Sequence, residues 1–460
     1  MKKIIYILFA AWSLGSCDLL DQEPSTSLST TTAITSVSDL ANAVNGAYYI
    51  ATYGDYLTMG AELAIYGDLV GPDSYQPASS GRHASMFGTF TMTPADTDNA
   101  YYYLYKALAN VNKAIEEAAA LEDQEGAAPY VAELYAMRGL FHFHLATFFA
   151  PIPTSGNTAN TMGIVLSDRV FPIDYVGERA SVERTYQQIV DDFTAAIQTG
   201  LNKEQNTGHV NYWAALALRA RAYLYWGKYS EALEDCKEII ADSPYSLYTT
   251  DNYTSVWAGE GTSEMLMEYI QTDTYNAQRY APGYYTSPEG YSEYGVSEAF
   301  YNYMKQDQRD IRSEMVAYLS GKNPGYYPLK YPGKSGAATP EYTNNIKVIR
   351  LSEVYLIAAE AALQNDAGAA AGYINDLRRN RIAGYEDVTS VELKEVLDER
   401  RKELFAEGQI AFDYWRNKKQ VEQASGKIIA PNDNKTVLPL PKTEIDLAKG
   451  VLVQNPGYGN

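Results

Sequence analysis

The side chains best suited to metal binding or acid–base catalysis in this chain are its four histidines. His142 and His144 are two residues apart in a segment predicted to be helical, so their rings point to different faces and cannot share one metal ion as a pair at i and i+4 can. His83 lies in a Gly/Ser-rich loop, and His209 lies near a predicted helix start. We therefore interpret them as structural or surface histidines and predict no metal site.

Paired carboxylates are the other candidates for chemistry, because glycoside hydrolysis needs two of them at a suitable separation. Adjacent acids such as Asp191-Asp192 lie on predicted amphipathic helices, where acids normally form the solvated face. Asp68, Asp73 and Glu289 lie in predicted loops, which would have to bring them together. No nucleophile elbow, phosphate-binding glycine loop or EF-hand loop is present in the sequence. We predict that the protein is not an enzyme and needs no cofactor; a surface hydrolase is the alternative.

A cluster of charges runs from Glu399 through Arg400-Arg401-Lys402 to Glu403, and Glu407 follows it. Opposite charges three or four residues apart on a helix attract each other across a turn. We interpret the cluster as a structural ion-pair network, solvated or buried, rather than as an anion-binding site.

The scaffold that must position these groups is predicted to be helical. The predicted helices cover residues 99–121, 129–149, 210–226, 230–241, 346–363, 367–381 and 391–406. In the pair around residue 228, four residues have the spacing of a tetratricopeptide repeat, namely Gly227, Tyr229, Ala232 and Pro244. Because one helix pair cannot bury its apolar face alone, three or four such pairs are expected to stack.

The amino terminus has the anatomy of a secretory signal. Met1-Lys2-Lys3 precedes an apolar run over 4–14, which is shorter than the roughly 20 residues of a membrane span. The run ends in Leu14-Gly15-Ser16-Cys17, which resembles the lipobox of bacterial lipoproteins. We predict a signal peptide over 1–16, a membrane anchor of acyl chains on Cys17, a flexible acidic and Ser/Thr-rich tether over 17–38, and a single domain over 39–460.

The overall charge excludes one class of partner. The chain carries a formal net charge of −20, which repels nucleic acid phosphates. Cys236 is the only cysteine besides Cys17, so no disulfide forms within the mature domain. Stability must therefore come from a hydrophobic core.

Two long segments, 53–98 and 245–345, lack the periodicity of helices or strands. Loops of this length are usually functional or disordered. Both are rich in tyrosine, and 275–295 alone contains six tyrosines among glycines, prolines and small polar residues. Because disordered segments contain few aromatic residues, we predict that these segments are ordered.

Several motifs, in order along nearly the whole chain, resemble those of the SusD/RagB family of outer-membrane nutrient-binding lipoproteins. They are 135–145 with Pro151-Ile152-Pro153, 350–361, 370–381, 399–408, Leu438-Pro439-Leu440-Pro441 and 454–458. The chain departs from the family at Gln409-Ile410, which replace the arginine usual after the Glu-Gly pair, and at Ile382, which separates Arg381 from Ala383-Gly384. These departures caution against transferring the ligand of any one member.

The resemblance implies a mainly α fold with tetratricopeptide-like helix pairs as a scaffold, long irregular loops, few short strands and a loop-rich ligand-binding region around 245–345. It also implies a surface-exposed lipoprotein that captures oligosaccharides without catalysis and delivers them to a SusC-like TonB-dependent transporter. Members that capture peptides leave peptide binding as the alternative, and a pure scaffold is a third possibility.

Tyrosine suits sugar binding because its ring packs on the C–H face of a sugar while its hydroxyl hydrogen-bonds. The predicted ligand-binding residues are Tyr280, Tyr284, Tyr285, Tyr291 and Tyr294, with Tyr75 from the other long loop. Alternatively, these tyrosines fasten the loop to the scaffold or contact the transporter.

Overall fold

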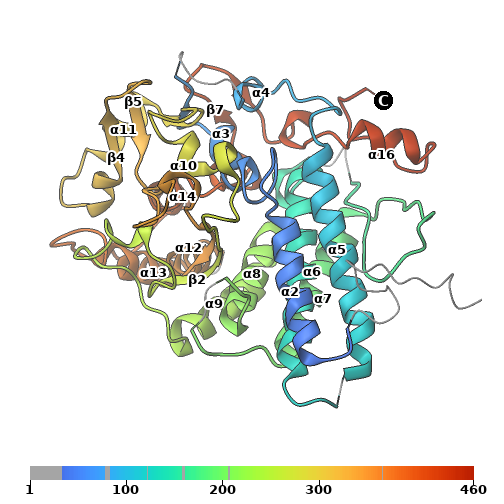
Figure 1. Cartoon of the computed structure of the whole chain (residues 1–460). Coiled ribbons are helices and arrows are strands. Elements are labelled where there is room, and N and C mark those ends of the chain that lie inside the picture. Colours follow the sequence, from blue (N-terminus) through green and yellow to red (C-terminus); the bar gives the residue numbers. More distant parts are fainter. Residues whose placement is uncertain are drawn as a thin grey trace, which may run out of the picture.

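The computed structural model describes residues 34–77, 83–121, 123–157, 161–205, 208–364 and 366–459. The predicted signal peptide, the lipidation site Cys17 and the tether as far as residue 33 lie outside the described residues. The fold is mainly α, as predicted (Figure 1). The long helices are α2 (Val37–Ala51), α5 (Asp98–Ala118), α6 (Ala127–Phe149), α7 (Val182–Thr199), α8 (Tyr212–Trp226), α9 (Tyr229–Asp242), α12 (Leu351–Ala362), α13 (Ala367–Arg379) and α14 (Leu393–Leu404).

These helices pack on one another in chain order. Helix α5 packs on α6, α6 on α7, α7 on α8 and α8 on α9, and α9 then packs on α12, which contacts α13 and α14. The pair predicted around residue 228 is present, and Gly227 ends α8 with a φ of +81°, a conformation that favours glycine. Ala232 of α9 is fully buried, which allows the two helices to approach closely.

Helix α2 adds one more layer against α5, at the start of the described chain. Its first turn is a capping box, in which Ser36 accepts from the backbone N–H of Asp39 and the Asp39 carboxylate accepts from that of Ser36. The helix therefore begins at Val37, so the last two residues of the predicted tether, 37 and 38, belong to it.

The predicted helix over 346–363 is wrong in its first turn. Residues 346–350 form strand β6 (Ile346–Arg350), antiparallel to β2 (Met265–Tyr269), and helix α12 begins only at Leu351. Ile346, Val348 and Ile349 are β-branched and buried, which suits a strand. Sequence alone did not separate the short apolar strand from the apolar helix that follows it.

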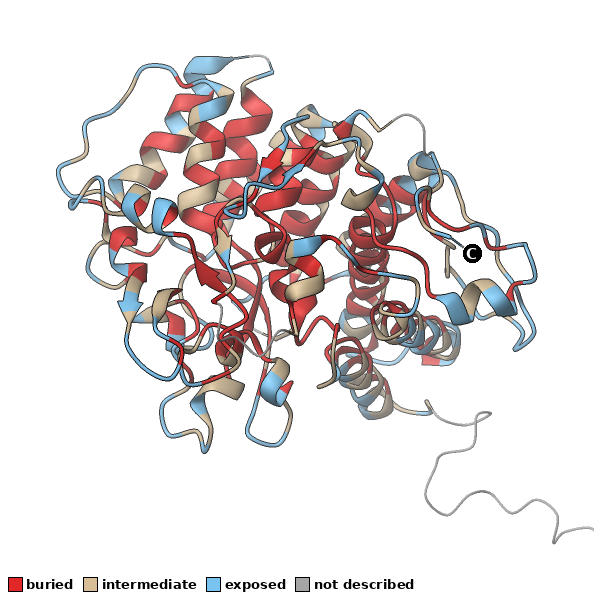
Figure 2. Ribbon diagram, turned by 90° about the horizontal axis from the view of Figure 1, so that it is seen from above, coloured by how far each residue is buried: buried red, intermediate tan, exposed pale blue. Residues whose placement is uncertain are grey.

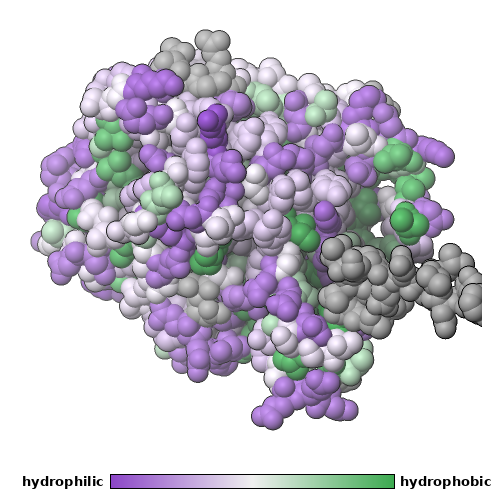
Figure 3. All heavy atoms as spheres, viewed as in Figure 1, coloured by the Kyte–Doolittle hydropathy of each residue, from purple (hydrophilic) through white to green (hydrophobic). Residues whose placement is uncertain are grey.

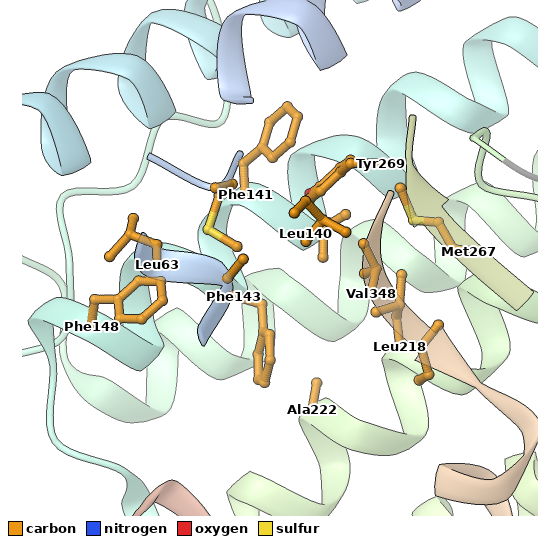
Figure 4. Close-up of a cluster of buried hydrophobic side chains, with 14 of the residues drawn as sticks. Leu63, Leu140, Phe141, Phe143, Phe148, Leu218, Ala222, Met267, Tyr269 and Val348 are labelled. Atoms are coloured by element: carbon orange, nitrogen blue, oxygen red, sulfur yellow. The ribbon is translucent and has the colours of Figure 1, made fainter. Parts of the chain in front are cut away.

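The core lies where α6, α8 and this two-stranded ribbon meet (Figure 4). Helix α6 contributes Leu140, Phe141 and Phe143, and the ribbon contributes Met267 and Tyr269. Almost every residue of α6 from 132 onward is buried, so the helix is enclosed on all sides. Figure 2 shows the buried residues, in red, concentrated along the packed helices.

The segment over 245–345 is ordered, as predicted, and is held by short elements. It contains α10 (Pro282–Tyr285) and α11 (Glu298–Met304), and β3 (Gly295–Val296) pairs with β1 (Ser74–Tyr75). The other short elements are β4 (Val316–Leu319) with β5 (Gly325–Pro328), β7 (Val421–Glu422) with β8 (Ile428–Ile429), α3 (Tyr66–Leu69), α4 (Ser85–Thr89), α15 (Ile410–Arg416) and α16 (Lys442–Leu447). Among the helices of the described residues, none combines the length and apolar character needed to cross a membrane.

The charged cluster of α14 forms the predicted ion-pair network, in its buried form. The Glu403 carboxylate accepts hydrogen bonds from Arg312, Arg350 and Arg381, and all four side chains are fully buried. Burial alone would raise the pKa of Glu403, but the three guanidinium groups hold it well below its usual range. The network joins α14 to β6, to the end of α13 and to the 245–345 segment.

Candidate ligand-binding site

Two of the predicted tyrosines are buried anchors. The Tyr285 hydroxyl donates to Glu62 Oε1 at 2.6 Å, and the Tyr294 hydroxyl donates to Asp68 Oδ1 at 3.2 Å. Both rings are fully buried, so neither can contact a ligand, which corrects the prediction for Tyr285 and Tyr294. They fasten 275–295 to the scaffold, as the alternative interpretation of these tyrosines proposed.

The carboxylates that receive these anchors are unusual because neither forms an ion pair within the described chain. Burial raises the pKa of Glu62 to about 7, although the hydrogen bonds from Tyr285 and from the Leu57 backbone lower it. Burial likewise raises the pKa of Asp68 to about 7, although its bonds from the Ala406 and Gly408 backbone lower it. Both acids therefore hold neighbouring loops through hydrogen bonds rather than through charge pairing.

The other tyrosines of the segment form an aromatic surface with residues from two distant loops. We call this surface the tyrosine platform; its members are His83, Tyr280, Tyr284, Tyr291 and Tyr342. The His83 and Tyr291 rings stack with centroids 4.3 Å apart, Tyr284 lies 5.1 Å from Tyr291 and 5.4 Å from Tyr342, and Tyr280 lies 5.9 Å from His83. All five are partly exposed. Tyr284 lies in α10, which is labelled in Figure 1 and marks the place of the platform in the fold.

A third buried acid positions His83 over the platform. The Glu293 carboxylate accepts from the backbone N–H groups of His83 and Ala84 at 2.7 and 2.9 Å, and from the side-chain amide of Gln76. Glu293 lies two residues after Tyr291, so one carboxylate fixes both partners of the stacked pair. Sequence reasoning missed His83 and Tyr342 as platform members, because only the fold brings them beside 280–291.

Tyr75 is exposed but lies apart from the platform. Tyr75 pairs with Gly295 in the β1–β3 ladder, and its side chain lines a hollow together with Gln76, Thr89 and Lys427. No ring contact joins Tyr75 to the platform within the described part of the chain. Tyr75 therefore stays a prediction for a separate contact.

A second aromatic surface was not predicted. Tyr275 stacks on Tyr49 of α2 with centroids 4.3 Å apart, and Tyr53 stacks on Tyr103 of α5 at 4.9 Å. The Tyr275 hydroxyl is hydrogen-bonded to Thr52 at 2.9 Å. We call Tyr49, Tyr53, Tyr103 and Tyr275 the tyrosine row; it lies across the end of α2 and the start of α5. On the face drawn in Figure 3, hydrophobic patches are small and separate, and tyrosine lies near the middle of the hydropathy scale, so aromatic surfaces do not stand out there.

The acids considered for catalysis have structural partners instead. Asp73 accepts from Arg401 at 2.7 Å, and Glu289 accepts from the backbone of Lys322 at 3.2 Å. Asp192, which was predicted on a solvated face, is buried because this face of α7 packs on α6, where Arg138 donates to it at 2.6 Å. Among the described residues, no group of three or more His, Cys, Asp or Glu side chains is placed to hold a metal ion.

The comparisons with known proteins agree with this architecture. A model described as "SusD family" matches residues 244–458, and one described as "Starch-binding associating with outer membrane" matches 18–224. A solved structure of a protein proposed to bind sugar, from Bacteroides vulgatus, is 30% identical, with a TM-score of 0.85, 93% of this chain and 100% of that chain covered. The chain belongs to the SusD/RagB family.

Two further relatives match over most of their length. SusD-like protein P2 of Formosa agariphila is 24% identical, and 99% of both chains is covered. Surface glycan-binding protein A from Bacteroides thetaiotaomicron, solved in complex with laminarihexaose, is 22% identical with a TM-score of 0.72, covering 91% of this chain and 99% of that one. At 22% identity, the similarity to surface glycan-binding protein A shows a shared fold and no more.

Proposed function

We propose that this SusD/RagB protein captures oligosaccharides at the cell surface without altering them and delivers them to a SusC-like TonB-dependent transporter. Acyl chains on Cys17 would hold it on the outer membrane. Family membership, the outer-membrane association described for the model over 18–224, and relatives described as sugar- or glycan-binding support the proposal.

The observation that carries the proposal is the tyrosine platform on a rigid base. Four tyrosine rings and one imidazole gather from three segments. Buried carboxylates fasten two of them, because Glu62 and Asp68 hold 275–295 on the scaffold and Glu293 holds the loop of His83. Aromatic rings bind the C–H faces of sugars, and each contact contributes roughly 0.5–1.5 kcal/mol beyond buried area, by analogy with aromatic pairs. A few such contacts give the modest affinity that suits a protein which must release its cargo.

Calorimetric titration of the lipid-free domain with a panel of oligosaccharides and oligopeptides tests the binding step. We expect Tyr284→Ala and Tyr291→Ala each to weaken glycan binding roughly 2- to 10-fold. Tyr175→Ala is the matched control, because Tyr175 is also exposed but stacks on Phe171 in a different loop. If Tyr53→Ala weakens binding and the platform variants do not, the site is the tyrosine row instead.

The same titrations address the alternatives. Binding of oligopeptides without any glycan would make the sugar assignment wrong and favour peptide capture. Glycans should be recovered intact after long incubation, and turnover that disappears in Asp73→Asn or Glu289→Gln would refute the non-catalytic part. Delivery is tested separately: the full chain with Cys17 should co-purify from outer membranes with a TonB-dependent transporter, and Cys17→Ser should abolish this.

A further inference from the structure

An arginine beside the tyrosine platform forms no ion pair with a carboxylate of the described chain. Arg279 lies in the turn before Tyr280 and is exposed. Its short 3-10 helix, Gln278–Tyr280, contacts α10, which carries Tyr284, and the turn Pro340–Tyr342. Interaction with Tyr291 and Tyr342 raises the pKa of Arg279, and both of those rings contact Tyr284.

The partners of Arg279 distinguish it from the other arginines. Within the described ranges, every arginine except Arg179 and Arg279 has a carboxylate oxygen within 4.0 Å. Arg179 is half-buried and donates to backbone carbonyls, including those of Gly163 and Phe149. Arg279 is thus the exposed arginine of the described chain that has no carboxylate partner.

The excess of acidic residues in the protein makes the absence of a carboxylate partner at Arg279 unusual. Acidic residues outnumber Lys and Arg, at 57 against 37, so an exposed arginine has ample opportunity to acquire a carboxylate neighbour. Glu341, which adjoins Tyr342, approaches Tyr284 closely enough to raise its pKa, yet it forms no ion pair with Arg279. An arginine has five N–H donors, more than two neutral tyrosine hydroxyls can accept from. Some donors of the Arg279 guanidinium are therefore left for another partner.

A guanidinium is a planar fork that matches the oxygen pair of a carboxylate or a sulfate group. We propose that the platform binds an anionic oligosaccharide and that Arg279 recognises its carboxylate or sulfate group while a neighbouring sugar ring lies on Tyr284. This inference rests on the proposed glycan-binding function and adds the charge class of the ligand.

The size of the effect follows from the kind of bond. A hydrogen bond to a charged group contributes about 1.5–3 kcal/mol net, which corresponds to roughly 10- to 100-fold in affinity. The net charge of −20 repels an anionic ligand over longer distances, and added salt screens this repulsion and the contact together. Comparisons are therefore made at one fixed ionic strength.

The test uses ligand pairs that differ only in charge. The lipid-free domain is titrated with oligogalacturonate and its methyl ester, and with a sulfated galactan oligosaccharide and its desulfated form. We expect the wild type to bind the charged member of at least one pair roughly 10-fold or more tightly than the neutral member. The pair that shows the difference identifies a carboxylate or a sulfate as the recognised group.

The variants connect this preference to Arg279. Arg279→Gln keeps hydrogen-bond donors near Tyr291 and Tyr342 but removes the charge, so we expect the charged ligand to lose its advantage while neutral binding stays. Arg279→Lys should keep part of the preference, because the charge remains without the fork. Arg309→Gln is the control, since Arg309 is similarly exposed but pairs with Asp307.

Several outcomes overturn the inference. If the wild type binds neutral glycans as tightly as charged ones, the platform does not select anions, although the proposed glycan function stands. If Arg279→Gln weakens charged and neutral ligands equally, Arg279 supports the rings and does not recognise charge. If no glycan of either kind binds, the proposed function fails together with the inference.

Discussion

Replacement of Glu62 by glutamine is expected to stabilise the protein at pH 8 and to leave its stability nearly unchanged at pH 5. The Glu62 carboxylate is fully buried, with Tyr285 on one oxygen and the Leu57 backbone N–H on the other, each at 2.6 Å. Asp55 adds a like charge nearby, and no cation pairs with Glu62 among the described residues. A glutamine keeps a hydrogen bond at both positions: its oxygen accepts from Leu57, and its amide donates to the tyrosine oxygen, which reverses the direction of the Tyr285 bond just as a proton on Glu62 Oε1 does.

The direction of the pH dependence follows from the raised pKa. The folded protein holds the Glu62 proton up to a pKa of about 7, whereas the unfolded chain releases it near 4.5. The native state therefore binds more protons between these values, and the contribution of Glu62 to the free energy of unfolding falls as the pH rises through this window. At about 1.4 kcal/mol per pH unit, the loss between pH 5 and pH 8 amounts to roughly 2–3 kcal/mol.

Urea denaturation of wild type and Glu62→Gln at pH 5 and pH 8 measures this difference directly. We expect the variant to gain about 2–3 kcal/mol over the wild type between the two pH values. Asp68→Asn is the contrasting variant: the Ala406 and Gly408 backbone N–H groups occupy both oxygens, so an amide would set a donor against a donor and destabilise at both pH values. A Glu62→Gln variant that is equally destabilised at both pH values would refute the reasoning, because Glu62 would then be ionised throughout.

Three further outcomes are expected from the packing. Glu403→Gln should lower the free energy of unfolding by roughly 3–5 kcal/mol in urea denaturation, because it leaves three buried arginines with incomplete compensation, and a change below about 1 kcal/mol would contradict the buried network. Gly408→Ala should lower the melting temperature markedly in a thermal scan, because φ is +81° and the added Cβ would lie 2.4 Å from the Ala64 carbonyl oxygen. Gly426 has the same φ but open space around it, so Gly426→Ala should lower the melting temperature less. In the lipid-free domain, Cys236 should react with a thiol reagent only on unfolding, since it is fully buried and burial raises its pKa; fast labelling of the folded protein would contradict this.

The helical scaffold could be predicted from sequence because its signals are local. The period of apolar residues located α5, α6 and α8, and Gly227 marked the turn of a helix pair. The failure at Ile346–Arg350 arose because an apolar strand runs directly into an apolar helix without a Gly or Pro between them. The strand is defined by its pairing with β2, which lies far away in the sequence.

The site was predicted less completely, since composition reveals which segment is aromatic but not which rings face outward. Tyr284 and Tyr285 are neighbours in α10, yet the first is partly exposed and the second is fully buried against Glu62. What separates them is the position of that acid, more than 200 residues earlier in the chain. His83 joins the platform for the same kind of reason, through the bonds of its segment to Glu293.

The two kinds of tyrosine in 275–295 have complementary roles. A loop that becomes ordered only when it binds loses affinity, because the ordering of its side chains and backbone opposes association. Here Tyr285 and Tyr294 are already bonded to buried acids, and Glu293 already holds the loop that carries His83. In the proposed function, the exposed rings would therefore meet a ligand in a fixed arrangement, so that a few weak contacts suffice. The same logic fits the absence of an ion pair on Glu62 and Asp68 among the described residues: a hydrogen bond from a tyrosine hydroxyl satisfies the carboxylate and places a neighbouring ring in the same step.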